Sequence, residues 1–211
     1  MRLILGAVIP ATVVIAGLAP AVTTTPAASV ASARDNAHAA NGCIAVTATV
    51  PVGSFPEGVA VNPKANTVYV TNARDNTVSV ISGRTNTVVA TIPVGGNSAG
   101  VAANPKTNTT YVTSDGADNT VSVINGRTNT VTATIPVGAV PFGVAANPKT
   151  NTIYVTNSQA STVSVISGRT NTVTATIPVG SGAFGVAANP KTNTTYVATD
   201  TVLSVLAPCP R

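Results

Sequence analysis

Eight cationic side chains recur at fixed places in this chain and could bind anions together. A lysine follows each of four Asn-Pro pairs, an arginine follows a glycine in three repeats, and Arg211 ends the chain. The set is Lys64, Arg84, Lys106, Arg127, Lys149, Arg169, Lys191 and Arg211. Such side chains bind phosphate, sulfate or carboxylate groups when the fold gathers them. The formal net charge of +5 agrees with that chemistry.

The sequence contains few residues that could perform catalytic chemistry. The one histidine, His38, precedes the repeats, and the two cysteines, Cys43 and Cys209, lie at their two ends. Nucleophile–base pairs and most metal sites need histidine, cysteine or clustered carboxylates. The sequence therefore predicts a protein that is not an enzyme, with no catalytic residues, no metal and no cofactor.

The elements that carry these residues repeat every 42 to 43 positions, as the four tyrosines show. These are Tyr69, Tyr111, Tyr154 and Tyr196. Each unit contains short segments in which apolar and small polar residues alternate, which is typical of β-strands. The first unit predicts strands at 58–62, 67–71, 77–81 and 87–92. A repeat of this length fits one four-stranded blade of a β-propeller.

Two kinds of turn join the predicted strands. Asn62-Pro63-Lys64 and its counterparts place proline where a type I turn fixes φ. Between the third and fourth strands, Gly83, Gly126 and Gly168 are expected to supply a positive φ. In an antiparallel meander these two kinds of turn share one side of the sheets, so all eight cations are expected there.

The opposite side is expected to carry Glu57, Asp75, Asp115, Asp118 and Asp200. Two interpretations of the basic side stay open. It binds a polyanion, or its lysines and arginines keep the turn tips soluble and unpaired.

The repeats resemble those of the YVTN β-propeller family, which includes surface-layer and periplasmic proteins. The resemblance rests on Tyr69-Val-Thr-Asn72 and Tyr154-Val-Thr-Asn157, with variants at Tyr111 and Tyr196, and covers residues 44–208. It implies a propeller, and some relatives bind DNA or act as lyases or lactone hydrolases. The histidine, glutamate and metal of those enzymes have no matching residues here.

The order of the repeats predicts how the ring would close. Residues 44–52 match the fourth strand of a repeat, whereas the last repeat stops after its third strand, at Leu206. We therefore expect an all-β propeller of four four-stranded blades, closed by this N-terminal strand. The alternative is half of an eight-bladed ring made by two chains. Cys43 and Cys209 would flank the missing turn and form a disulfide there.

A second candidate site lies in the loops that join one repeat to the next. These loops vary most, and they contain Phe55, Glu57, Phe142 and Phe184. The three aromatic rings could line a ligand pocket with one carboxylate, or they could pack between the blades.

The N-terminus indicates an extracytoplasmic protein. Arg2, an apolar run and small residues up to Ala33 form a signal-peptide pattern, which predicts a signal peptide at 1–33, a flexible leader at 34–43 and the repeats at 44–211. We expect a secreted or cell-surface protein without a membrane span after cleavage.

Three functions follow, in decreasing order of support. The first is a noncatalytic binding module for an unknown protein, glycan or polyanionic envelope ligand. The second is polyanion binding, nucleic acid included, through the basic side, and the third is a propeller lyase or lactone hydrolase. The chain is expected to act as a monomer or as a head-to-tail homodimer.

Overall fold

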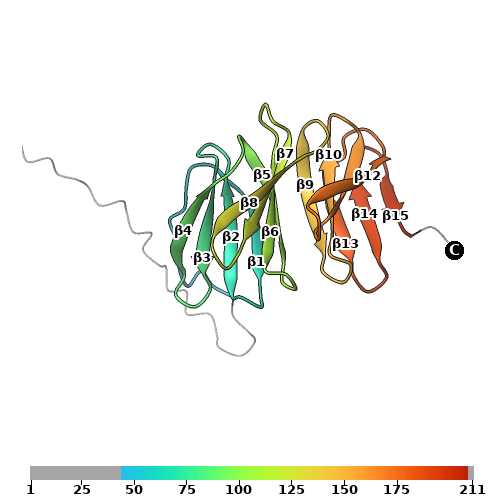
Figure 1. Cartoon of the computed structure of the whole chain (residues 1–211). Helices are drawn as coiled ribbons and strands as arrows, with labels where there is room; N and C mark the ends of the chain where they lie inside the picture. The colour runs from blue at the N-terminus through green and yellow to red at the C-terminus, as the bar shows by residue number, and fades with distance from the viewer. Residues whose placement is uncertain (1–43, 209–211) are drawn as a thin grey trace, which may run out of the picture. The chain divides into compact units, whose positions relative to one another are not determined.

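In the part of the chain that the structure describes, fifteen β-strands form four antiparallel sheets, which follow one another in chain order (Figure 1). The structure is a computed structural model that describes residues 44–208. The first sheet consists of β1 (Pro56–Asn62), β2 (Thr67–Asn72), β3 (Thr77–Ser82) and β4 (Thr87–Pro93). The second consists of β5 (Ser98–Asn104), β6 (Thr109–Ser114), β7 (Thr120–Asn125) and β8 (Thr130–Pro136).

The third sheet repeats this pattern and the fourth is one strand short. The third consists of β9 (Pro141–Asn147), β10 (Thr152–Asn157), β11 (Thr162–Ser167) and β12 (Thr172–Pro178). The fourth consists of β13 (Val186–Asn189), β14 (Thr194–Ala198) and β15 (Leu203–Leu206). The four strands predicted for the first repeat are therefore confirmed, as is the all-β repeat architecture.

The turns use asparagine where the sequence predicted glycine. Asn66 in the β1–β2 turn and Asn86 in the β3–β4 turn have φ values of 50° and 53°. Asparagine tolerates this left-handed conformation better than most residues, because its short side chain can hydrogen-bond locally. The expected positive φ at Gly83, Gly126 and Gly168 is wrong, since among the described residues Gly182 is the one glycine with a positive φ.

Two of these turn glycines, Gly126 and Gly168, instead make room for the preceding sheet. A Cβ atom on Gly126 would lie 2.7 Å from the Tyr69 hydroxyl oxygen, and one on Gly168 would lie 2.8 Å from that of Tyr111. Real Cβ atoms do not approach other atoms so closely. The tyrosines of the first and second sheets therefore reach into spaces that glycine leaves in the next sheet.

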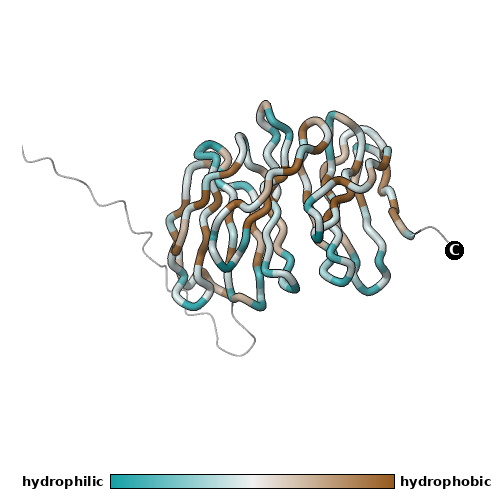
Figure 2. The backbone as a smooth tube through the Cα atoms, viewed as in Figure 1, coloured by the Kyte–Doolittle hydropathy of each residue, from teal (hydrophilic) through white to brown (hydrophobic). Residues whose placement is uncertain are grey.

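The core lies between neighbouring sheets and not within one of them. Tyr69, Val78 and Val80 of the first sheet pack with Val112 and Ile124 of the second. The same arrangement recurs between the second and third sheets around Tyr111. Figure 2 shows hydrophobic residues along the strands and hydrophilic residues at the turns. Burial raises the pKa of Tyr111 to about 12, because the ionised phenolate would lose its hydration there.

The threonine of the Tyr-Val-Thr-Asn tetrapeptide bridges two sheets. Thr71 accepts a hydrogen bond from the Gly58 amide at 2.8 Å and donates one to the Ala99 carbonyl of the next sheet at 2.8 Å. The Asn72 side-chain amide donates to Thr77 and Ser79 within its own sheet. The tetrapeptide therefore has a structural role, which is to align each sheet with its neighbour.

The predicted closed propeller is wrong, in its four-bladed form and as half of an eight-bladed ring, because the sheets are not closed. Residues 44–52 form no strand, and Ile44 and Val46 are 99% and 88% exposed. Within the described residues, the fourth sheet ends at β15 without a fourth strand. Three junctions join the four sheets in chain order, and no strand of the fourth sheet pairs with a strand of the first within residues 44–208.

Candidate functional site

The first strands of the four sheets line a hollow of about 480 Å³. A Gly-Val pair in each of β1, β5 and β9 contributes to the lining. The fourth pair ends at Val186, the first residue of β13. The pairs are Gly58–Val59, Gly100–Val101, Gly143–Val144 and Gly185–Val186. A Cβ atom on Gly58 would lie 2.5 Å from the Ala99 carbonyl oxygen of β5. Glycine at this position therefore lets neighbouring first strands approach closely enough to form a continuous surface.

Two phenylalanine rings form one part of this hollow. The rings of Phe142 and Phe184 are perpendicular, with centroids 5.7 Å apart, an edge-to-face arrangement that aromatic pairs prefer. They are 44% and 47% exposed, so both present apolar surface to a ligand. Their backbone carbonyls accept hydrogen bonds from Thr113 and Thr156, each at 2.8 Å, which fixes β9 at Phe142 and the segment before β13 at Phe184.

One carboxylate lines the hollow. Glu57, at the start of β1, is the one charged residue of the lining. The structure therefore brings together three of the four loop residues that the sequence singled out, namely Glu57, Phe142 and Phe184. We refer to this surface, with the four Gly-Val pairs, as the first-strand hollow.

Phe55 is not part of the first-strand hollow. Its ring lies 5.0 Å from the guanidinium carbon of Arg74, a cation–π contact, and its φ of 57° directs the loop before β1. Sequence reasoning grouped the three phenylalanines because all of them precede a first strand. It missed the Gly-Val pairs, whose signal was the recurrence of glycine at the same place in four repeats.

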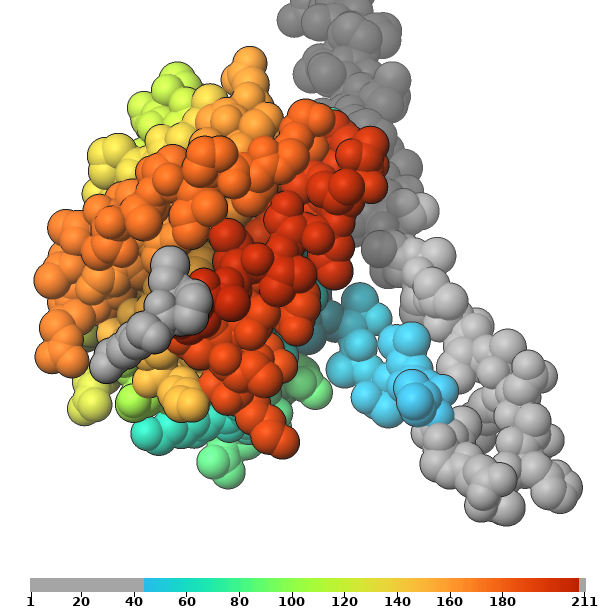
Figure 3. Space-filling model, turned by 90° about the vertical axis from the view of Figure 1, so that its right-hand side faces the viewer, coloured from blue at the N-terminus to red at the C-terminus, as the bar shows by residue number. Residues whose placement is uncertain are grey.

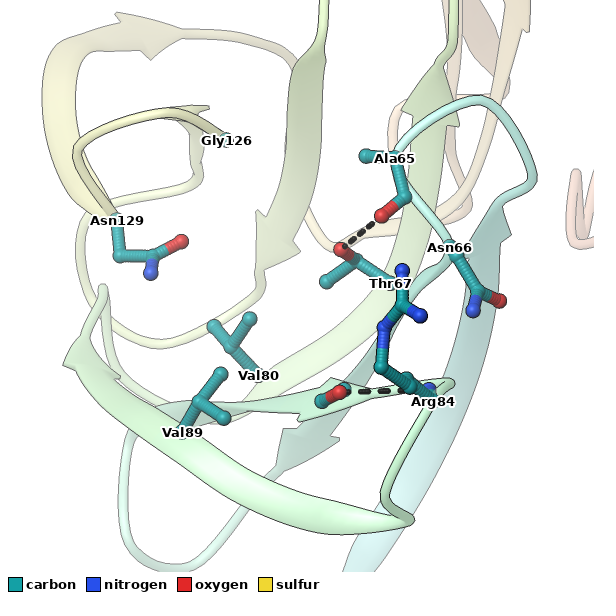
Figure 4. Close-up of a pocket in the computed structure, with 9 residues that line it drawn as sticks. Ala65, Asn66, Thr67, Val80, Arg84, Val89, Gly126 and Asn129 are labelled. Atoms are coloured by element: carbon teal, nitrogen blue, oxygen red, sulfur yellow. Dashed lines mark hydrogen bonds between the residues drawn. The ribbon is translucent and has the colours of Figure 1, made fainter.

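The turns on the other end of the first strands gather cations. Lys64, Lys106 and Arg127 line a second hollow of about 310 Å³, which we call the basic notch. Arg84 lines a smaller hollow of about 160 Å³ beside it, together with Asn66, Asn129 and Gly126 (Figure 4). No carboxylate lines either of these two hollows.

The remaining predicted cations lie on equivalent turns or outside the described residues. Lys149 and Lys191 occupy the β9–β10 and β13–β14 turns, and Arg169 occupies the β11–β12 turn. Arg211, Cys43 and Cys209 lie outside residues 44–208, so the structure does not describe the predicted disulfide or the last cation.

The acidic residues of the opposite side hold loops in place. Asp75 accepts a hydrogen bond from the Ser54 amide at 2.7 Å, and Asp200 accepts one from the Ser181 hydroxyl at 3.1 Å. Asp115 accepts one from the side-chain amide of Asn97. These carboxylates therefore position the segments that lead into β1, β5 and β13.

Neither metal-ligand clusters nor spanning helices occur in the part of the chain that the structure describes. Within residues 44–208, histidine, cysteine and carboxylate side chains form no group of three that could hold a metal ion. The same residues contain no helix that is long and apolar enough to cross a membrane.

Comparisons with known proteins give a fold and little more. No protein-family model matches the chain. A stretch of 34 residues is 65% identical to the PE-PGRS family protein PE_PGRS18 of Mycobacterium tuberculosis, but it spans 16% of this chain and 7% of that protein. Among solved structures, a hydrazine synthase of Kuenenia stuttgartiensis superposes with a TM-score of 0.69 and 22% identity. That superposition covers 79% of this chain and 49% of the other, so the chain spans about half of its structural relative.

Proposed function

We propose that this protein is a secreted or cell-surface binding module without catalytic activity, built from repeats of the YVTN type. The first-strand hollow supports this proposal, because it combines exposed aromatic rings with a single carboxylate. Its volume of about 480 Å³ falls within the range of small-molecule sites, roughly 300 to 1,000 Å³. The proposed extracytoplasmic location rests on the signal-peptide pattern at 1–33. The disulfide between Cys43 and Cys209 stays a prediction from the sequence.

The lining of the hollow suggests the chemistry of its ligand. The faces of Phe142 and Phe184 attract apolar groups and cations, since the face of an aromatic ring is electron-rich. Glu57 adds one negative charge to this otherwise uncharged surface. The ligand that fits best is a small organic cation with an apolar or aromatic body and one amine.

A pair of ligands that differ in charge tests this proposal. We expect the full chain to bind 2-phenylethylamine more tightly than phenylacetate, as measured by calorimetric titration. Glu57→Gln should weaken amine binding by about two- to fivefold, because an exposed ion pair contributes about 0.5 to 1 kcal/mol. Phe184→Ala should weaken the binding of both ligands.

Phe55→Ala serves as the matched control, because Phe55 lies outside the hollow and its loss should leave both titrations unchanged. Circular dichroism confirms that each variant folds. If Glu57→Gln binds the amine as tightly as the unchanged protein does, the assigned ligand chemistry is wrong. If neither ligand binds at millimolar concentration, the hollow is not a site for a small organic cation.

A further inference from the structure

The basic notch places three cations from different turns around one space. Lys64 comes from the β1–β2 turn, Lys106 from the β5–β6 turn and Arg127 from the β7–β8 turn. The notch therefore spans the junction of the first and second sheets. Arg84, in the adjoining hollow of Figure 4, adds a fourth cation at the same junction.

Hydrogen bonds between asparagines hold these like-charged turns together. The Asn62 side-chain amide donates to the Asn108 side-chain oxygen at 2.7 Å, and both residues line the notch. Equivalent bonds join Asn104 to Asn151 at 2.8 Å and Asn147 to Asn193 at 2.9 Å. The turns that carry the lysines are thus fixed before any ligand arrives, which lowers the entropy cost of binding.

The cations of the notch have no counter-charge in its lining. Asn62, Pro105, Thr107 and Asn108 complete that lining with Ala65, and none of them carries a negative charge. Fixed positive charges that face one space repel each other and attract anions. An anionic group in the notch would relieve this repulsion.

We propose that the basic notch binds the phosphate groups of a linear polyanion that has no bases. The same turn residues recur along the molecule, so Lys106 also lies at the second junction, with Lys149 and Arg169 on equivalent turns. A polymer with one anionic group per unit can therefore contact successive junctions. No aromatic side chain lines the notch or the adjoining hollow, and base stacking on aromatic rings is a main source of affinity for single-stranded nucleic acids.

This inference concerns a different site from the first-strand hollow. The hollow is lined by the beginnings of the first strands, whereas the notch is lined by the β1–β2 and β5–β6 turns and, at Arg127, by the β7–β8 turn. The two sites can therefore succeed or fail independently.

The test uses long-chain inorganic polyphosphate as the probe and measures its binding to the full chain over a range of salt concentrations. The double variant Lys106→Gln/Arg127→Gln should bind at least tenfold more weakly. The slope of its plot of log affinity against log salt concentration should be smaller in magnitude by about 1.4. Each lost contact with a flexible polyanion reduces this slope by about 0.7. Arg74→Gln is the matched control, because Arg74 lies on the opposite side, against Phe55. It should leave both quantities unchanged.

Each other outcome overturns a stated part of the proposal. The double variant removes two charges and Arg74→Gln removes one, so a loss in Arg74→Gln half as large as that in the double variant would mean that net charge, and not the notch, attracts the polymer. Tighter binding of a single-stranded DNA of equal charge would reject a ligand without bases. Orthophosphate binding as tightly as polyphosphate would reject a polymer. Circular dichroism, which does not depend on either proposed ligand, checks that the double variant is folded.

Discussion

The junctions between sheets and the end of the array contain the same residue types in very different surroundings. Tyr69 and Tyr111 are fully buried, whereas Tyr196 of the fourth sheet is 38% exposed. Val80 lies opposite Tyr69 on the neighbouring strand and is 1% exposed, but Val205, opposite Tyr196, is 58% exposed. A residue's burial in this fold is therefore decided by the next sheet and not by its own.

The end of the array also differs in its polar contacts. Thr71, Thr113 and Thr156 each donate a hydrogen bond to a carbonyl of the following sheet. The fourth sheet has Ala198 at this position, in Tyr196-Val-Ala-Thr199. Figure 3 looks onto this end of the chain and shows the red strands of the fourth sheet at the surface. Within residues 44–208, no sheet beyond the fourth offers a carbonyl to this position.

Replacing a tyrosine should give the largest difference in stability loss between a junction of two sheets and the end of the array. Tyr111→Ala should lower the free energy of unfolding by about 3 to 5 kcal/mol, because it leaves a large cavity between two sheets. Tyr196→Ala should cost about 1 kcal/mol or less, because much of that ring already contacts solvent. Urea denaturation followed by circular dichroism measures both. Similar losses in the two variants would refute the view that burial comes from the next sheet.

Replacing a glycine by alanine should give the second largest difference in stability between a junction and the end of the array. Gly58→Ala places a Cβ atom 2.5 Å from the Ala99 carbonyl oxygen of the second sheet, so the sheets must move apart. Overpacking of this kind costs about 1 to 3 kcal/mol. Gly185→Ala has 3.6 Å to its nearest neighbour, Ala198, and should leave stability unchanged or raise it by up to about 1 kcal/mol. The same denaturation measurement decides, and a loss at Gly185 as large as at Gly58 would contradict the comparison.

The strands could be predicted from the sequence because their causes are local. Alternating apolar residues and regular turn signals place β2 and β3 within one residue of the predicted ranges, 67–71 and 77–81. The closure could not be predicted, because it depends on the angle between sheets. Contacts such as that of Tyr69 with the second sheet set this angle, and no local pattern reveals them.

In the candidate site too, features with local causes could be predicted from the sequence, and features set by contacts between sheets could not. Loop variation identified Glu57, Phe142 and Phe184, since variable loops often carry binding residues. The sequence predicted the wrong role for Gly126. Glycine is required there because the Tyr69 hydroxyl, from another sheet, occupies the space that a Cβ atom would fill. The pairing of Asn62 with Asn108 was also missed, since the two residues are 46 positions apart.

The bridging threonine should give the smallest of the three differences. Thr113 is buried, accepts a hydrogen bond from the Gly100 amide and donates one to the Phe142 carbonyl, each at 2.8 Å. Thr113→Val keeps the shape of the side chain but leaves two backbone groups without that partner, which should cost about 1 to 2 kcal/mol. Ala198→Thr, the reverse change at the end of the array, should bring no gain in urea denaturation, because no following sheet offers a carbonyl there within residues 44–208. A stabilising Ala198→Thr would instead mean that the fourth sheet has a neighbour in solution.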